Sequence, residues 1–98
     1  MQINKTLENQ KMTLALEGRL DTLTAPQLDA EITGKLEGIK ELVFDFTNLA
    51  YISSAGLRIL LTAQKVMNKQ GSMVIKGANT DIKEIFEVTG FCDILTVE

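Results

Sequence analysis

The chain has 98 residues, of which 45% are hydrophobic and 23% charged, and its formal net charge at pH 7 is −3. This length and composition predict one globular domain, which we place at residues 1–98. The ten basic residues are scattered, which argues against a nucleic-acid partner. No apolar run is long enough to insert into a membrane and the first residues lack a signal-peptide core, so we expect a cytoplasmic protein.

The chain contains no histidine and one cysteine, Cys92. The lack of histidine excludes a histidine-based catalytic triad, a histidine metal site and a histidine phosphorelay within these residues. One cysteine cannot form an internal disulfide, and we expect Cys92 to be a small packed residue. The sequence therefore predicts no catalytic residue, no metal ligand and no cofactor.

The first 21 residues predict a β-hairpin followed by a turn. Residues 2–7 have the pattern of a weak strand, and residues 12–17 alternate apolar and polar side chains as a half-buried strand does. The polar residues between them suit a hairpin connection, so the two strands should pair. Residues 18–21, Gly-Arg-Leu-Asp, are predicted to form a turn.

A first helix is predicted to start at Thr24. Thr24 and Gln27 have the spacing of a capping box, and Pro26 lies in the first turn, where its missing N–H costs little. Gly34 should weaken the helix by about 1 kcal/mol relative to alanine, and Gly38 should end it. The buried stripe is expected to consist of Ala25, Leu28, Ile32 and Leu36.

The central stretch predicts a buried strand, a short turn and a long helix. Residues 42–46 form a short, mostly apolar run, and Asn48 suits the turn that should follow. Ser53 or Ser54 is expected to cap the helix, because a serine hydroxyl can accept from an unpaired first-turn N–H. Gly71 should end it in a left-handed conformation. The stripe set at helical spacing is Leu57, Leu60, Leu61, Gln64 and Met67.

The last part of the chain predicts a strand, a helix and a short final strand. Residues 72–76 are apolar at their centre, and because a helix separates them from the central strand, the two strands should be parallel. Asn79 or Thr80 is expected to cap a third helix, which Gly90 should end. Residues 94–97 could form one more strand. The buried stripe of the third helix is expected to be Ile82, Ile85, Phe86 and Thr89.

These elements run strand, strand, helix, strand, helix, strand, helix, strand. The order predicts an α/β (α+β) fold with a single mixed sheet of four to five strands, covered by three or more helices. No repeat, low-complexity tract or linker interrupts it, which supports the assignment of one domain.

Four segments in order are similar to the STAS family, the domain of bacterial anti-sigma factor antagonists. Residues 51–61, Tyr-Ile-Ser-Ser-Ala-Gly-Leu-Arg-Ile-Leu-Leu, carry the resemblance most clearly. Residues 18–25 resemble the family's Gly-x-Leu-Asp turn, and residues 43–46 resemble the strand before the site. Residues 71–75 and 85–91 resemble the later strand and helix. The resemblance covers nearly the whole chain and implies the STAS fold.

The resemblance implies a protein-binding switch, not an enzyme. In its unphosphorylated form such a domain binds an anti-sigma factor that is also a GHKL-type serine kinase, and so frees a sigma factor. The kinase phosphorylates a serine at the start of the second helix, and a PP2C-type phosphatase removes the phosphate. The resemblance implies no cofactor, and we expect the free chain to be a monomer.

Aligned on Gly56, the phosphorylated serine of the family falls on Ser54, with Ser53 as the alternative. Ser53 stands where the family often has aspartate, and Ala55 where serine or threonine is common. The residues themselves also suit plainer roles: a helix cap for Ser53 and close backbone packing for Gly56. The partner surface implied by the resemblance comprises Asp21, Ser53, Ser54, Ala55, Gly56 and Arg58.

Three other functions compete with this one. A serine between a strand and a helix is also found in a nucleophile elbow, but that motif needs glycine two residues earlier, where Tyr51 or Ile52 stands. A STAS docking subunit that is not phosphorylated, in a lipid-transport ABC complex or a signalling scaffold, stays open because Ser53 replaces the usual aspartate. The cytoplasmic domain of an anion transporter is disfavoured by the lack of a membrane segment.

Overall fold

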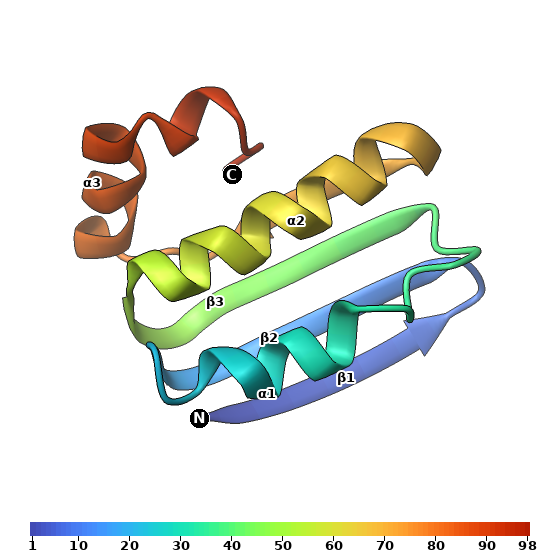
Figure 1. The fold of residues 1–98 in the computed structure, drawn as a ribbon, viewed down its shortest axis with the longest axis horizontal. Coiled ribbons are helices and arrows are strands. Elements are labelled where there is room, and N and C mark those ends of the chain that lie inside the picture. The colour runs from blue at the N-terminus through green and yellow to red at the C-terminus, as the bar shows by residue number, and fades with distance from the viewer.

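The computed structural model describes all residues 1–98 and folds them into one sheet with α1 and α2 on one of its faces (Figure 1). The four strands are β1 (Gln2–Glu8), β2 (Lys11–Leu20), β3 (Glu41–Ile52) and β4 (Ser72–Lys76). The helices are α1 (Ala25–Ile32), α2 (Ser54–Gln70) and α3 (Thr80–Thr89), followed by a short 3-10 helix at Phe91–Asp93. No helix combines the length and the apolar content that crossing a membrane requires. The predicted fold class is confirmed.

The strands lie side by side in the order β1-β2-β3-β4. β1 and β2 are antiparallel, as expected of a hairpin, whereas β2 with β3 and β3 with β4 are parallel. Parallel strands end at the same edge of a sheet. The turn after β2 and the start of α2 after β3 therefore meet at one end of the molecule, which we call the Ser54 end (Figure 1).

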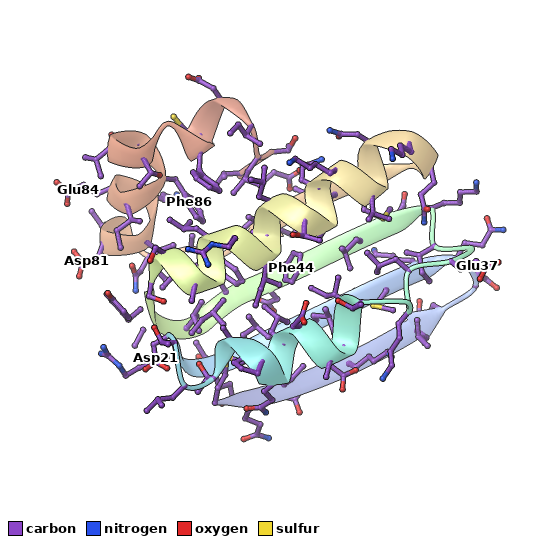
Figure 2. All side chains as sticks on the ribbon, in the orientation of Figure 1. Asp21, Glu37, Phe44, Asp81, Glu84 and Phe86 are labelled. Carbon is purple, nitrogen blue, oxygen red and sulfur yellow. The ribbon has the colours of Figure 1, made fainter.

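The core lies between the sheet and the helices. Alternate residues of β2 and β3, such as Leu14 and Phe44, are fully buried in one cluster with residues of all three helices. The rings of Phe44 and Phe46 lie 5.9 Å apart between centroids, and Phe86 brings α3 into the same cluster (Figure 2). Burying one such side chain contributes about 1.5–3 kcal/mol. This cluster holds the helices on the sheet and fixes where α2 begins.

Strands β2 and β3 are longer than the sequence predicted. The turn expected at residues 18–21 begins only at Asp21, and the turn expected around Asn48 is absent, because β3 continues past it. The register shifts between Ala15 and Glu17 and again between Gly18 and Arg19, and pairing continues as far as Leu20 and Ile52. Both of these side chains are buried, at 0% and 1% exposure, which favours the extended conformation of both segments.

Helix α1 ends at Ile32, not at Gly38. Gly34 and Gly38 both have positive φ, +74° and +81°, so the chain turns at these glycines and does not continue the helix. Leu36 is buried as expected, but from the connection that follows the helix.

Gly71 ends α2 as predicted, but not in the left-handed conformation. Its φ is −178°, an extended value that any residue adopts. Glycine is needed here for a different reason, because a Cβ atom at this position would collide with the carbonyl oxygen of Lys40. The end of α2 therefore packs directly on the backbone that leads into β3.

Helix α3 starts and ends where the sequence predicts. The Asn79 side chain accepts from the backbone N–H of Ile82 at 2.8 Å, and Gly90 ends the helix at a left-handed φ of +79°. Thr89 is exposed, contrary to expectation, and its hydroxyl donates to the Ile85 carbonyl at 2.6 Å. Only a narrow stripe of α3 is thus in the core.

The C-terminal segment contains less regular structure than predicted. The expected last strand is reduced to a single parallel bridge between Val97 and Ile75. Cys92 is exposed, which corrects the expectation that it is packed. It lies in the 3-10 helix after α3, where Phe91 packs against the core; Leu95, just beyond this helix, is buried in the core.

Candidate functional site

The Ser54 end joins two segments that are far apart in the sequence. The backbone N–H of Ser53 donates to the carbonyl of Leu20 at 2.9 Å, which continues the pairing of β2 with β3 by one residue. Asp21 follows immediately in the chain and lies in the turn between β2 and α1 (Figure 2). The structure therefore brings Asp21 close to the start of α2, as the partner surface predicted from the resemblance requires.

The two serines differ in accessibility. Ser53 occupies the N-cap position of α2, but its hydroxyl accepts no capping hydrogen bond, and its oxygen is buried without a partner. Ser54 is the first residue of the helix and is exposed. A partner protein can thus reach the Ser54 hydroxyl, whereas the Ser53 hydroxyl is shielded by its surroundings.

The first turn of α2 has no negative charge to balance its N-terminus. It contains no acidic residue, and Ser53 does not cap it. Helix α3 contrasts with it, because Asn79 caps that helix and Asp81 lies in its first turn. Unpaired N–H groups and the helix dipole favour an anion by about 0.3–1 kcal/mol. The start of α2 can therefore accommodate a negative group on Ser54 without loss of the helix.

Gly56 serves packing at this end. It is buried, and a Cβ atom would lie 2.7 Å from Leu20 Cγ and 2.9 Å from Ile52 Cγ1. Both distances are shorter than real Cβ contacts, so only glycine lets α2 approach the ends of β2 and β3 this closely. Ala55, beside it, is half-buried and lies on the rim of the surface. Of these two predicted partner residues, Ala55 is accessible and Gly56 is not.

Asp21 organises the turn that precedes α1. Its Oδ1 accepts from the N–H groups of Leu23 at 3.0 Å and Thr24 at 3.1 Å. The capping box expected at Thr24 is absent, because the Thr24 hydroxyl accepts from the Asp21 N–H and donates to the Arg19 carbonyl. Desolvation works to raise the pKa of the Asp21 carboxyl, but the hydrogen bonds from Thr24 and Leu23 outweigh it. The nearby Arg19 charge acts in the same direction, so the pKa lies below its usual value.

Three further residues at this end, Leu23, Arg19 and Tyr51, were not predicted from the sequence to belong to the site. Leu23 is 90% exposed in the Asp21 turn. The guanidinium carbon of Arg19 lies 4.4 Å from the centroid of the Tyr51 ring, and Tyr51 is itself 37% exposed. The cation and the ring are paired only because β2 and β3 align Arg19 with Tyr51. For Leu23, its place between two polar threonines in a turn was the available signal.

Arg58 lies on the exposed face of α2, one turn after Ser54. It lines a shallow depression of about 380 Å³ between α1 and α2, together with Ala55, Pro26 and Asp29. The three ion pairs of the molecule are Lys5–Glu31, Arg19–Asp21 and Lys76–Glu98, so Arg58 has no acidic partner. Arg58 is therefore an exposed cation whose charge is not neutralised within the chain.

Asp45, in the middle of β3, does not belong to the Ser54 end. It alternates with Phe44 and Phe46, which are in the core, and so projects from the opposite face of the sheet. Its Oδ1 accepts from the hydroxyl of Thr47 at 2.6 Å and from the Thr47 N–H at 3.0 Å. These hydrogen bonds hold the pKa of Asp45 below its usual value. The carboxylate stabilises the local strand geometry.

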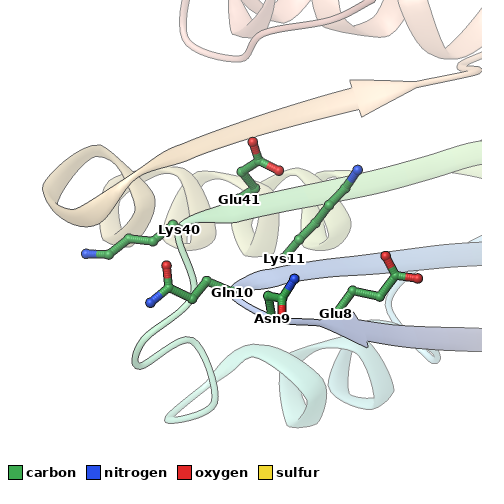
Figure 3. Close-up of a pocket in the computed structure, with 6 residues that line it drawn as sticks. All are labelled: Glu8, Asn9, Gln10, Lys11, Lys40 and Glu41. Atoms are coloured by element: carbon green, nitrogen blue, oxygen red, sulfur yellow. The ribbon is translucent and has the colours of Figure 1, made fainter.

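A second depression, of about 360 Å³, lies at the opposite end of the molecule, where the β1–β2 hairpin meets the start of β3 (Figure 3). None of the predicted site residues is there, and the lining is entirely polar: Glu8, Asn9, Gln10, Lys11, Lys40 and Glu41. The backbone N–H groups of Lys40 and Glu41 both donate to the Gln10 carbonyl, at 2.8 and 3.2 Å. These backbone contacts hold two connections together, and no residue there suggests chemistry.

The chain has clear relatives. Residues 2–98 match the STAS domain family. BtrV of Bordetella bronchiseptica, named as an anti-sigma factor antagonist, is 38% identical over 84 residues, which cover 84% of this chain and 72% of BtrV. The anti-sigma-B factor antagonist of Staphylococcus aureus is 26% identical over 99% of this chain and 92% of its own length. An anti-sigma factor antagonist from Mycobacterium paratuberculosis has the same fold, with a TM-score of 0.87 at 18% identity, over 98% of this chain and 83% of that one.

Proposed function

This chain belongs to the STAS domain family, and on that premise we propose that it is an anti-sigma factor antagonist controlled by phosphorylation of Ser54. In its unphosphorylated form it binds an anti-sigma factor through the Ser54 end and so releases a sigma factor. The anti-sigma factor is also a GHKL-type serine kinase, and a PP2C-type phosphatase resets the switch. The kinase holds the ATP, and this chain contributes only the serine.

The observation that carries this proposal is the contrast between the two adjacent serines. Ser54 is exposed at the first position of α2, while the Ser53 oxygen is buried. The Ser54 oxygen forms a bond to the γ-phosphorus of ATP, ADP leaves, and the hydroxyl proton passes to a base of the kinase. The free N-terminus of α2 tolerates the new charge, so the fold should persist.

Phosphorylation would act on docking and not on folding. A phosphate adds about −1.5 to −2 charges at pH 7. Burying it against a partner surface costs desolvation, and it repels acidic groups placed there. We expect the dissociation constant for the anti-sigma factor to rise at least tenfold, which corresponds to about 1.4 kcal/mol.

The test is to mix the purified chain with ATP and the serine kinase encoded next to its gene. The phosphate is then located by intact mass and peptide mapping. The wild type should gain one phosphoryl group on Ser54, and Ser54→Ala should gain none. Ser53→Ala is the matched control and should still be modified. Phosphate on Ser53 would contradict the proposed site. A stable complex that never becomes phosphorylated would instead favour the docking-subunit function.

A further inference from the structure

One cation at the Ser54 end is free, and one is already engaged. Arg19 Nε lies 3.8 Å from Asp21 Oδ2, and its guanidinium stacks on the Tyr51 ring. Arg58 forms neither an ion pair nor a stacking contact. Asp29, which lines the same depression, accepts from the Thr33 hydroxyl at 2.8 Å, not from Arg58. Arg58 is therefore available to a new anion at this end, whereas Arg19 is not.

The helix places Arg58 where it can reach Ser54. The two residues are four positions apart on α2 and so lie on the same face, with Cβ atoms about 5–6 Å apart. Long side chains on a helix lean back toward its N-terminus, which directs the guanidinium toward Ser54. An anion that precedes a cation by four residues is the favourable orientation of such a pair.

The geometry points to Arg58 as the intramolecular counter-ion of phosphorylated Ser54, bridging the phosphate to the second turn of α2. This inference rests on the proposed function. The guanidinium can form a two-point, charge-assisted contact with phosphate oxygens, while the unpaired N–H groups at the start of the helix face the same anion. The phosphate would supply the cap that Ser53 does not provide.

The bridge would change the docking surface in two ways at once. Before phosphorylation, Arg58 presents an unpaired positive charge beside Ser54 and is free to meet an acidic group of the partner. After phosphorylation, the same guanidinium is held by the phosphate. The partner thus loses an attractive contact and also meets a negative group. Phosphorylation should therefore weaken partner binding more than the added charge alone would.

The experiment uses the full chain with phosphoserine installed at position 54 during synthesis, so that no kinase is needed. The second pKa of the phosphate is measured by phosphorus NMR in the wild type and in Arg58→Gln. A free phosphoserine titrates near pH 6. We expect the wild-type value to lie about half a pKa unit below that of Arg58→Gln. The difference should shrink at high salt, because both groups are solvent-exposed.

Two controls make the result decisive. Lys65→Gln removes a cation that lies about 16 Å from Ser54 along the same helix, and it should leave the phosphate pKa unchanged. Arg19→Gln tests the competing cation: a shift there, with none in Arg58→Gln, would overturn the inference. Equal pKa values in the wild type and Arg58→Gln would also overturn it. Failure of the kinase to modify Ser54 is a separate result, because it contradicts the proposed function and leaves this measurement intact.

Discussion

Helix α2 runs along the sheet (Figure 1), and its two ends differ in the interactions that their side chains make. At its C-terminal end, the Gln70 side chain donates to the carbonyls of Leu36 and Ile39, at 2.6 and 2.8 Å. At its N-terminal end, Ser54 is exposed and Arg58 has no ion-pair partner. The polar side chain at the C-terminal end is hydrogen-bonded within the chain, whereas Ser54 and Arg58 at the N-terminal end are available to a partner protein.

This difference separates stability from contact. The C-terminal end is held by hydrogen bonds from α2 to the connection between α1 and β3. Substitutions that remove these bonds should lower the free energy of unfolding. The exposed groups at the Ser54 end contribute little to that free energy, and they are available to a partner.

The largest effect is expected for Gly71→Ala. The added Cβ would strike the Lys40 carbonyl oxygen, a backbone atom that cannot move aside without displacing the start of β3. We expect a loss of about 3 kcal/mol in the free energy of unfolding, measured by urea denaturation. Gly34→Ala is the control, because its position is open but has positive φ, and it should cost about 1 kcal/mol. Equal losses in the two variants would show that the close approach at Gly71 is not tight.

Gln70→Ala should cost about 1.5 kcal/mol. It leaves the partly buried carbonyls of Leu36 and Ile39 without their side-chain donor. Lys65→Ala, on the exposed face of the same helix, should change stability by less than about 0.5 kcal/mol. Thermal melts of the two variants side by side measure the difference. If Gln70→Ala were as mild as its control, the C-terminal end would not be the stabilising one.

The sequence predicted the strands and helices as far as α3, but not where β2, β3 and α1 end. Helix α2 was expected because its apolar residues recur at helical spacing, and this local signal needs no tertiary information. The extension of β2 to Leu20 depends on pairing with Ile52, which lies 32 residues away. The hydrogen bonds of Gln70 join it to carbonyls 34 and 31 residues away. Contacts of this kind have no local pattern, so sequence reasoning placed turns in two segments that are strands.

For the same reason, the sequence predicted where the candidate site lies but not how its residues are packed. The STAS resemblance, which the family match confirms, placed attention on the start of α2 and on Asp21. It could not reveal that the Ser53 hydroxyl is buried, because that depends on packing around the helix start. Leu23 was missed because its one local signal, a place between two threonines in a turn, does not establish how exposed the side chain is. Whether Ser54 is phosphorylated stays a prediction.

Asp21→Asn removes the carboxylate that accepts hydrogen bonds within the turn at the Ser54 end. The hydrogen bonds to its carboxylate lower its pKa in the folded state, so the charged form stabilises the fold. That contribution is present above the unfolded-state pKa and is lost as the pH falls through the lower folded-state value. We expect the variant to melt below the wild type at neutral pH, by less than Gln70→Ala, with the gap closing in acid. A gap independent of pH would mean that the charge plays no part.

The smallest effect on stability is expected for Leu23→Ser. The side chain is 90% exposed, so its replacement changes the buried surface area very little. The free energy of unfolding should therefore change by less than about 0.5 kcal/mol. Because Leu23 shares the Asp21 turn, its loss should weaken anti-sigma factor binding by about tenfold, measured by calorimetry. Val88→Ser is the matched control, since Val88 is 78% exposed on α3 away from this turn, and it should leave binding unchanged.

If both variants bind like the wild type, the docking surface does not include the Asp21 turn. If Leu23→Ser instead unfolds the chain, the Ser54 end carries stability as well as contact, and the separation between the two ends of α2 fails.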